Sequence, residues 1–155
     1  QAKMLFQPRY LFNKKFFQRK SWVSAIEKKL RRLPEKMQFW IGRLKFKMEK
    51  SQKVDYVAFG EALLALAQQT QGKTYQSIIV DWDNRARYKK RSKFFVHATP
   101  ANFEHFLKEL SLIEAAKGNE FVFINAWNEW SEGAYLEPDT TYEYQYLDVV
   151  KKLSE

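Results

Sequence analysis

The segment from Phe121 to Pro138 is an apolar run that gives way to a cluster of three carboxylates, two tryptophans and a tyrosine. The run, Phe121 to Trp127, is short and rich in β-branched and aromatic residues, which is typical of a buried strand. The side chains that follow it include Asn128, Glu129, Trp130, Glu132, Tyr135 and Glu137. Ligands and catalytic groups of α/β folds lie at the carboxyl ends of strands, so this segment is the first candidate for a functional site.

The chemistry that suits these residue types is the making or breaking of a glycosidic bond. Such reactions use two carboxyl groups, one as an acid and one as a base or nucleophile. Like charge and desolvation both favour the protonated form, so crowding Glu129 against Glu132 would push their pKa values apart. Trp127 and Trp130 offer flat faces for a sugar ring, and the Asn128 amide could hold a hydroxyl. The alternative is that the glutamates are solvated loop residues or part of a structural network.

A second acidic cluster follows another expected strand, Gln76 to Trp82. Its position at the end of a strand makes Trp82, Asp83 and Asn84 candidate substrate contacts. The alternative for Asp83 is a turn or a helix cap, which are common positions for Asp. We expect Arg87 to pair with Asp83, the alternative being that it binds an anionic group.

The longer motif, NAWNEWSEGAYLEPD from Asn125 to Asp139, resembles the closing motif of the WbsX-type glycosyltransferases of surface-polysaccharide synthesis. It is also similar to the catalytic motif of glycoside hydrolase family 99. Further segments resemble elements of the same family: residues 82–84 (WDN), residues 6–9 (FQPR) and Thr99-Pro100. The resemblance therefore spans nearly the whole chain.

The resemblance implies an α/β fold of the (β/α)8 TIM-barrel type and a carbohydrate-active enzyme of O-antigen or capsule synthesis, acting on an oligosaccharide or sugar-linked substrate. It implies that Glu129 is a base that deprotonates the neighbouring 2-hydroxyl and that Glu132 acts first as acid and then as base. The sugar site would be shaped by Trp82, Asp83, Asn84, Trp127, Asn128, Trp130 and Glu137. Ser131 differs from the residue usual in either group, which could alter the shape of a subsite or the direction of the reaction. Transfer and hydrolysis both stay open, because both need the same oxocarbenium-like centre.

We expect no cofactor and no metal, because His97 and His105 lack a third partner at metal-ligand spacing. The barrel fold typically needs about 250 residues and at least about 200. The chain has 155 residues. We therefore expect the C-terminal part of a longer barrel, with residues 1–155 as a single domain and residues 10–50 as a basic helical insertion within it. The alternative function is a catalytically incomplete fragment.

Charge is distributed unevenly along the chain, whose formal net charge is +9. Residues 1–50 carry 15 Lys and Arg against 3 Glu. Within them, residues 14–33 are expected to form a basic amphipathic helix, either an outer barrel helix or a peripheral contact with an anionic membrane. No nucleic-acid motif accompanies these charges. Zero cysteines fit a cytoplasmic protein, which the membrane alternative would place at the inner face of the membrane.

The remaining sequence predicts alternating strands and helices, hence an α/β fold with parallel pairing. Helices are expected over 56–69, with Asp55 as N-cap, over 100–116, with Thr99 as N-cap, and from Asp139 or Thr140 to the end of the chain. Residues 36–49 fit either a helix or a strand, and residues 85–93 are expected to form a basic loop. Strands are expected over residues 2–8, 76–82, 94–98 and 121–127.

Overall fold

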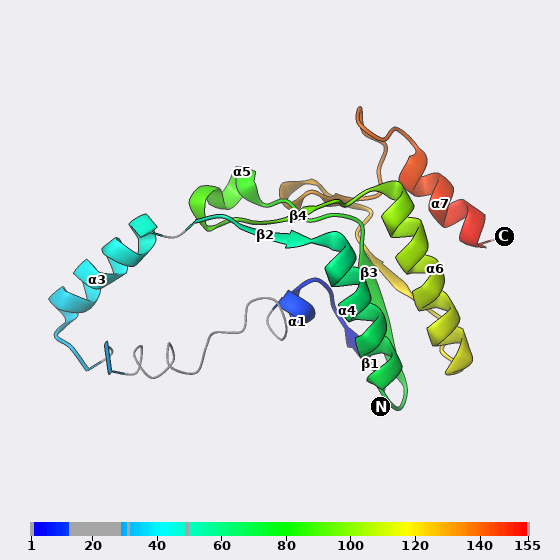
Figure 1. Cartoon of the computed structure of the whole chain (residues 1–155), viewed down its shortest axis with the longest axis horizontal. Helices are drawn as coiled ribbons and strands as arrows, with labels where there is room; N and C mark the ends of the chain where they lie inside the picture. Colours follow the sequence, from blue (N-terminus) through cyan, green and yellow to red (C-terminus); the bar gives the residue numbers. More distant parts are fainter. Residues whose placement is uncertain (1, 13–28, 31, 49, 155) are drawn as a thin grey trace.

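The computed structural model describes residues 2–12, 29–30, 32–48 and 50–154. Its central sheet has three parallel strands, β1 (Lys3–Leu5), β3 (Thr74–Ile79) and β5 (Phe123–Asn125), in that order (Figure 1). Because all three strands run the same way, their carboxyl ends meet at one edge of the sheet. The predicted α/β class and its parallel pairing are confirmed.

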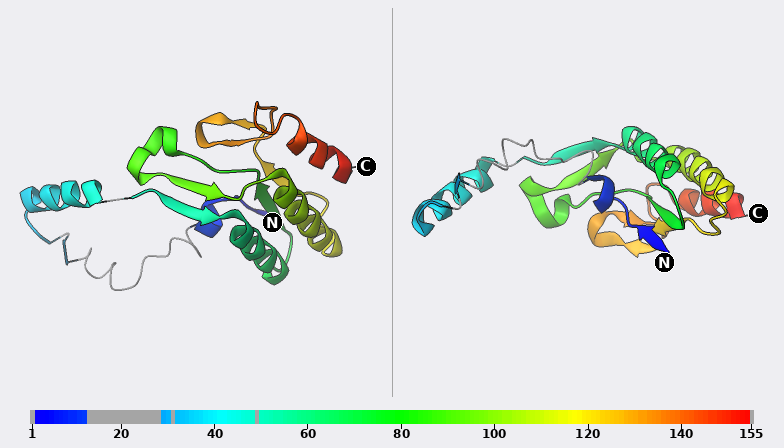
Figure 2. Two further views of the ribbon diagram at one scale, coloured as in Figure 1. Left: turned by 45° about the horizontal axis from the view of Figure 1, so that its top comes forward. Right: turned by 90° about the horizontal axis from the view of Figure 1, so that it is seen from below.

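Two long helices cover one face of this sheet, α4 (Tyr56–Gln69) and α6 (Pro100–Ala116), and they lie side by side (Figure 2). They approach closely at Gly60, where an added Cβ would lie 2.4 Å from the Phe106 ring. The buried core lies between these helices and the sheet, and its largest members are Tyr56, Phe59, Phe103, Leu63, Ile78, Ile79 and Leu110. Both predicted N-caps are confirmed, since Asp55 accepts from the Val57 N–H at 2.8 Å and Thr99 from the Asn102 N–H at 3.3 Å.

A second, two-stranded parallel sheet lies beyond the carboxyl ends of the main strands. It pairs β2 (Gln52–Asp55) with β4 (Lys93–Val96). The sequence of β2 did not predict a strand, because Val54 is its single aliphatic residue. Its first two residues are exposed and polar, so the segment lacks the apolar pattern of a buried strand. The expected basic loop instead forms two short helical turns, α5 (Arg85–Tyr88) and η2 (Lys89–Arg91).

After β5, the chain forms a small antiparallel hairpin. Its strands are β6 (Asn128–Glu129) and β7 (Ala134–Tyr135), and the short η3 turn (Trp130–Glu132) joins them. The strand predicted as buried over 121–127 is shorter, Phe123–Asn125, and its burial was predicted wrongly. Val122 and Ile124 pack against the core, whereas Phe121 and Phe123 are 58% and 43% exposed.

The last helix, α7 (Gln145–Ser154), begins later than the predicted start at Asp139 or Thr140. The Asp139 carboxylate accepts the N–H groups of Thr141 and Tyr142 at 2.7 and 2.6 Å, which closes a turn instead of a helix. Glu143 then adopts a positive φ of 50°, which the right-handed helix does not allow. The helix therefore starts only at Gln145.

In the described part of the N-terminal third, the single turn α1 (Arg9–Leu11) and the longer α3 (Glu35–Met48) are helical. The ambiguous 36–49 segment is thus helical, and α3 lies apart from the sheet and the long helices (Figures 1 and 2). Most of the expected basic helix over 14–33 lies outside the described residues. Within the described ranges, no helix is both long enough and apolar enough to cross a membrane.

Candidate functional site

Gln7 ties the ends of the three main strands together. It is fully buried, and its N–H donates to the Ser77 hydroxyl at 2.9 Å while its carbonyl accepts from the Asn125 amide at 3.1 Å. Its side-chain oxygen also accepts the Leu11 N–H at 3.2 Å, which holds α1 over the end of β1. The loops after β1, β3 and β5 therefore start from one braced edge of the sheet.

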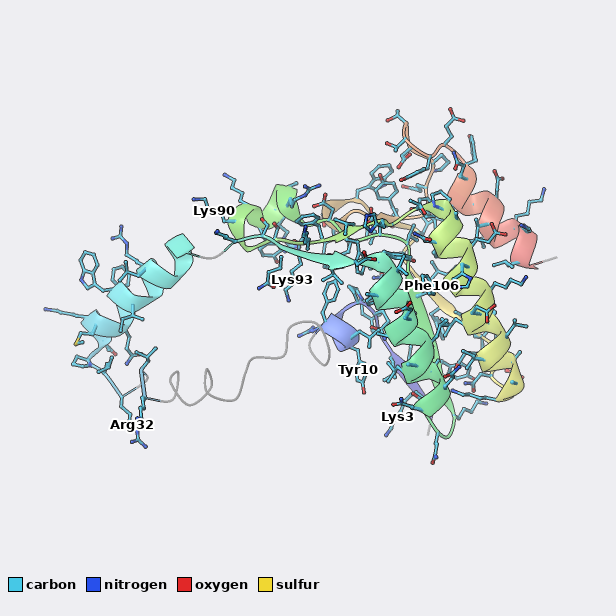
Figure 3. The ribbon with its side chains drawn as sticks, viewed as in Figure 1. Lys3, Tyr10, Arg32, Lys90, Lys93 and Phe106 are labelled. Carbon is cyan, nitrogen blue, oxygen red and sulfur yellow. The ribbon has the colours of Figure 1, made fainter. Side chains whose placement is uncertain are left out.

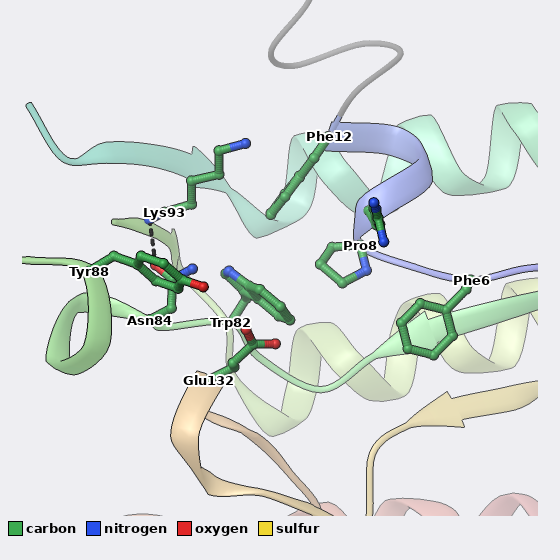
Figure 4. A pocket seen from close by; sticks show the side chains of 9 residues that line it. Phe6, Pro8, Phe12, Trp82, Asn84, Tyr88, Lys93 and Glu132 are labelled. Carbon is green, nitrogen blue, oxygen red and sulfur yellow. Dashed lines mark hydrogen bonds between the residues drawn. The ribbon is translucent and has the colours of Figure 1, made fainter. Parts of the chain in front are cut away.

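An open pocket of about 610 Å³ lies at this edge (Figure 4). Its walls come from all three strand-end loops and from β4. The lining residues are Phe6, Pro8, Arg9, Phe12, Trp82, Asn84, Tyr88, Lys93 and Glu132. Three of the predicted site residues, Trp82, Asn84 and Glu132, therefore line one pocket.

Trp82 and Asn84 are held against β4 by hydrogen bonds. The Trp82 carbonyl accepts the Phe95 N–H at 2.8 Å, and the Asn84 side-chain oxygen accepts the Lys93 N–H at 2.7 Å. This use of its amide oxygen makes buried Asn84 a brace for the pocket wall. The Trp82 indole N–H is buried and has no hydrogen-bond partner among the described residues.

Asp83 contributes mainly through its backbone. Its N–H donates to the Glu132 carbonyl at 2.7 Å, which joins the β3 loop to the β5 loop. Its carboxylate binds the Arg85 guanidinium at 2.7 and 3.0 Å. Burial raises the pKa of Asp83, but the Arg85 guanidinium outweighs burial and holds this pKa below its ordinary value. The predicted pairing of Asp83 with Arg87 was wrong. The Asp83 carboxylate accepts the Arg85 N–H at the start of α5, and this places it beside the Arg85 side chain, which is its ion-pair partner.

The two candidate catalytic carboxylates lie in different surroundings. The Glu132 side chain is 22% exposed, and an Arg87 nitrogen lies 3.6 Å from its Oε1. Burial raises the pKa of Glu132 first, nearby Glu129 raises it further, and Arg87 opposes both effects. Glu129 is exposed on β6, where its carboxylate accepts from the Ser131 hydroxyl, and it does not line the pocket.

The other predicted sugar contacts gather on the hairpin outside the pocket lining. Trp130 stacks on Tyr135, with 3.8 Å between ring centroids, and its indole N–H donates to the Glu137 carboxylate at 2.6 Å. Asn128 is exposed on β6, and the indole of Trp127 is 55% exposed. The predicted residues therefore form two groups, a pocket group (Trp82, Asn84, Glu132) and a hairpin group (Trp127, Asn128, Glu129, Trp130, Glu137), with Asp83 linking them through its backbone.

Gly133 allows the hairpin to approach the β3 loop. It has a φ of +64°, and an added Cβ would lie 3.0 Å from the Asp83 nitrogen. We expect Gly133→Ala to lower the free energy of unfolding by about 1–2 kcal/mol more than Gly118→Ala does. Gly118 is a matched control, because its φ is +72° but nothing lies within 4 Å of its added Cβ. Urea unfolding of both variants tests this expectation, and equal losses would contradict the close approach.

Several residues of the site were not among the predicted ones. Arg9 follows the strand-end FQP segment and had a usable sequence signal, whereas Tyr88 and Lys93 come from the supposed loop and had none. Asp81, the last acidic residue before Trp82, accepts the Trp82 N–H at 2.6 Å. Burial raises the pKa of Asp81 to about 7. No group of three potential metal ligands occurs among the residues described.

Comparison with known proteins shows the family to which the chain belongs. The profile of the family described as Glycosyltransferase WbsX matches residues 2–150, so the chain belongs to this family. Among curated proteins, it is 37% identical over 81 residues to "Uncharacterized protein WxcX" of Xanthomonas campestris pv. campestris strain B100, and equally to the protein of that name in a second strain. These matches cover 50% of the chain but only 12% of each WxcX protein. No solved structure matches.

Proposed function

We propose that the chain acts on glycosidic bonds, by transfer or by hydrolysis, in the synthesis of a surface polysaccharide such as O-antigen or capsule. The observation that carries this proposal is Glu132, a half-buried carboxyl with a raised pKa in a pocket beside Trp82. Membership of a family described as glycosyltransferase supports it. A carboxyl whose pKa is raised holds its proton more readily than an ordinary surface carboxylate, which suits the donor of a proton to a departing sugar oxygen.

In the proposed mechanism, Glu132 gives its proton to the departing glycosidic oxygen as the anomeric C–O bond breaks. Glu129 accepts the proton of the neighbouring 2-hydroxyl, whose oxygen bonds to the anomeric carbon in place of the departing oxygen, and the Ser131 hydroxyl bound to Glu129 orients its carboxylate. Glu132, now ionised, then takes a proton from the incoming hydroxyl as that oxygen bonds to the anomeric carbon. The bond between the 2-oxygen and the anomeric carbon breaks in this step, and Glu129 returns its proton to the 2-oxygen. Transfer or hydrolysis follows from whether the incoming hydroxyl belongs to a sugar or to water.

We further propose that the sheet is a segment of a (β/α)8 barrel. Its strands lie in chain order with α4 and α6 on one face (Figure 2), which is the arrangement of consecutive strands and helices in a barrel. Met4, Tyr75 and Phe123 share the other face through the sheet register, and Tyr75 contacts Phe123 edge-on at 6.1 Å. Met4 and Phe123 are 47% and 43% exposed there, as suits the inner lining of a barrel.

The complete product of the gene that encodes this chain provides the test. It is incubated with polysaccharide fragments and lipid-linked sugars, and mass spectrometry follows the gain or loss of sugar residues. We expect the mass of at least one substrate to change by one or more sugar units.

Trp127→Ala should raise KM about tenfold, because the exposed indole offers a stacking face to the sugar while contributing little to folding. Unchanged masses across the panel would contradict the proposed function, and an unchanged KM in Trp127→Ala would remove Trp127 from the sugar site.

A further inference from the structure

The pocket beside Glu132 carries more positive than negative charge. Arg9 and Lys93 line it, and Glu132 is the single carboxylate among those lining residues that the structure describes. That carboxylate already lies 3.6 Å from an Arg87 nitrogen. Asp83, just outside the lining, is neutralised by its ion pair with Arg85. The field inside the pocket therefore favours a negatively charged group.

Lys93 differs from an ordinary surface lysine. It is half-buried, burial lowers its pKa, and its ammonium lies 5.6 Å from the centroid of the Phe12 ring. Its backbone is fixed by the hydrogen bond to Asn84, so the side chain starts from a rigid wall of the pocket (Figures 3 and 4). Attraction between charges strengthens where water is partly excluded, so an anion placed here is bound more strongly than at the open surface.

Arg9 brings a second cation from the opposite strand end. It follows the buried Gln7-Pro8 segment, which the hydrogen bonds of Gln7 fix to β3 and β5. Its guanidinium has no ion-pair partner among the residues that the structure describes. A guanidinium binds a carboxylate or a phosphate through two parallel hydrogen bonds, which a neutral hydroxyl does not reproduce.

From these observations we propose that the pocket selects a sugar bearing an anionic group, a carboxylate or a phosphate, which Arg9 and Lys93 hold while the ring packs near Trp82 and Tyr88. This inference rests on the proposed function and names the class of its substrate. A neutral sugar would gain nothing from two cations, one of them partly desolvated. The anion and Glu132, the proposed acid, would then occupy the same pocket, so that selection and reaction occur together.

The experiment compares three probes on the complete gene product: methyl β-D-glucuronide, its neutral match methyl β-D-glucoside, and glucose 6-phosphate. Dissociation constants are measured by NMR titration at low and high salt. We expect at least one anionic probe to bind about tenfold or more tightly than the neutral probe, with an advantage that shrinks in high salt. The anionic probe that shows this advantage identifies carboxylate or phosphate as the group.

Arg9→Gln and Lys93→Gln should each reduce this advantage several-fold while leaving the affinity for the neutral probe unchanged. Lys108→Gln is the matched control, because Lys108 is exposed on α6 and does not line the pocket. Thermal unfolding of each variant checks that the fold is intact. If a variant is unfolded, Lys93→Arg keeps the charge and should retain most of the advantage, whereas Arg9→Lys keeps the charge but not the paired hydrogen bonds and should lose part of it.

The outcomes separate this inference from the proposed function. Equal binding of neutral and anionic probes, or an anionic advantage that survives both Gln variants, overturns the inference and leaves glycosidic chemistry standing. Absence of binding for every probe, together with unchanged masses in the turnover assay, overturns both.

Discussion

Replacing Glu132 by Gln is expected to lower turnover of a natural glycosidic substrate by about 100-fold to 10,000-fold. Glutamine fills nearly the same volume and can keep a contact with Arg87, but it has no proton to give to the departing oxygen. Glu132 is the predicted carboxylate that lies in the pocket and whose pKa is raised, first by burial. The measurement is kcat under saturating substrate for the complete gene product, with Glu61→Gln on the exposed surface of α4 as the control.

The leaving group distinguishes an acid from a residue that merely shapes the site. A substrate whose leaving group is a weak base, such as a dinitrophenolate, needs little protonation as it departs. The Glu132→Gln variant should therefore cleave the glycosidic bond of this substrate at nearly the rate of the wild type. Glu129→Gln should slow both substrates, because deprotonation of the 2-hydroxyl is needed whatever group departs. Equal losses on both substrates for Glu132→Gln would contradict its role as the acid.

Replacing Asp81 by Asn is expected to stabilise the protein at neutral and alkaline pH by about 2–4 kcal/mol. Burial raises the pKa of Asp81 from 3.8 to about 7. The folded protein therefore binds more protons than the unfolded chain between about pH 4 and pH 7, so the stability of the wild type falls as the pH rises through this window. Asparagine carries no charge and keeps an oxygen that can accept the Trp82 N–H.

Urea unfolding between pH 4 and pH 8 tests this expectation, provided that the stability of each protein is followed across the whole range. The Asn variant should lose less stability than the wild type as the pH rises, and the two should agree near pH 4. Asp148→Asn is the matched control, because Asp148 is exposed on α7. Parallel pH curves for wild type and Asp81→Asn would show that Asp81 is not buried in its neutral form.

The helices with strong local signals were predictable from the sequence. Asp55 and Thr99 cap α4 and α6 where expected, because an N-cap acts within four residues and needs no tertiary partner. The late start of α7 was not predictable in this way. It depends on the side chain of Asp139 closing a turn and on Glu143 adopting a positive φ.

The loops that form the candidate site could be predicted from the sequence, but the residues that complete the wall of its pocket could not. The carboxylates and indoles after two apolar runs located the loops of Asp81 to Asn84 and Trp127 to Glu137. Lys93 and Tyr88 reach the pocket only because β4 pairs with β2 beyond the main sheet, a long-range contact that local patterns do not show. The roles of Glu129 and Glu132, and the status of residues 10–50 as an insertion, stay predictions.

The link between Asp83 and Glu132 runs from a backbone N–H to a backbone carbonyl. A side-chain change at position 83 would therefore leave that link intact, whereas a proline there would remove the donor and break it. The two sides of the site thus differ in how freely their sequences can vary. The side chain at position 83 can change and so alter the contacts with the substrate. Gly133, which packs against the backbone of Asp83, keeps the loop of Glu132 in the same place.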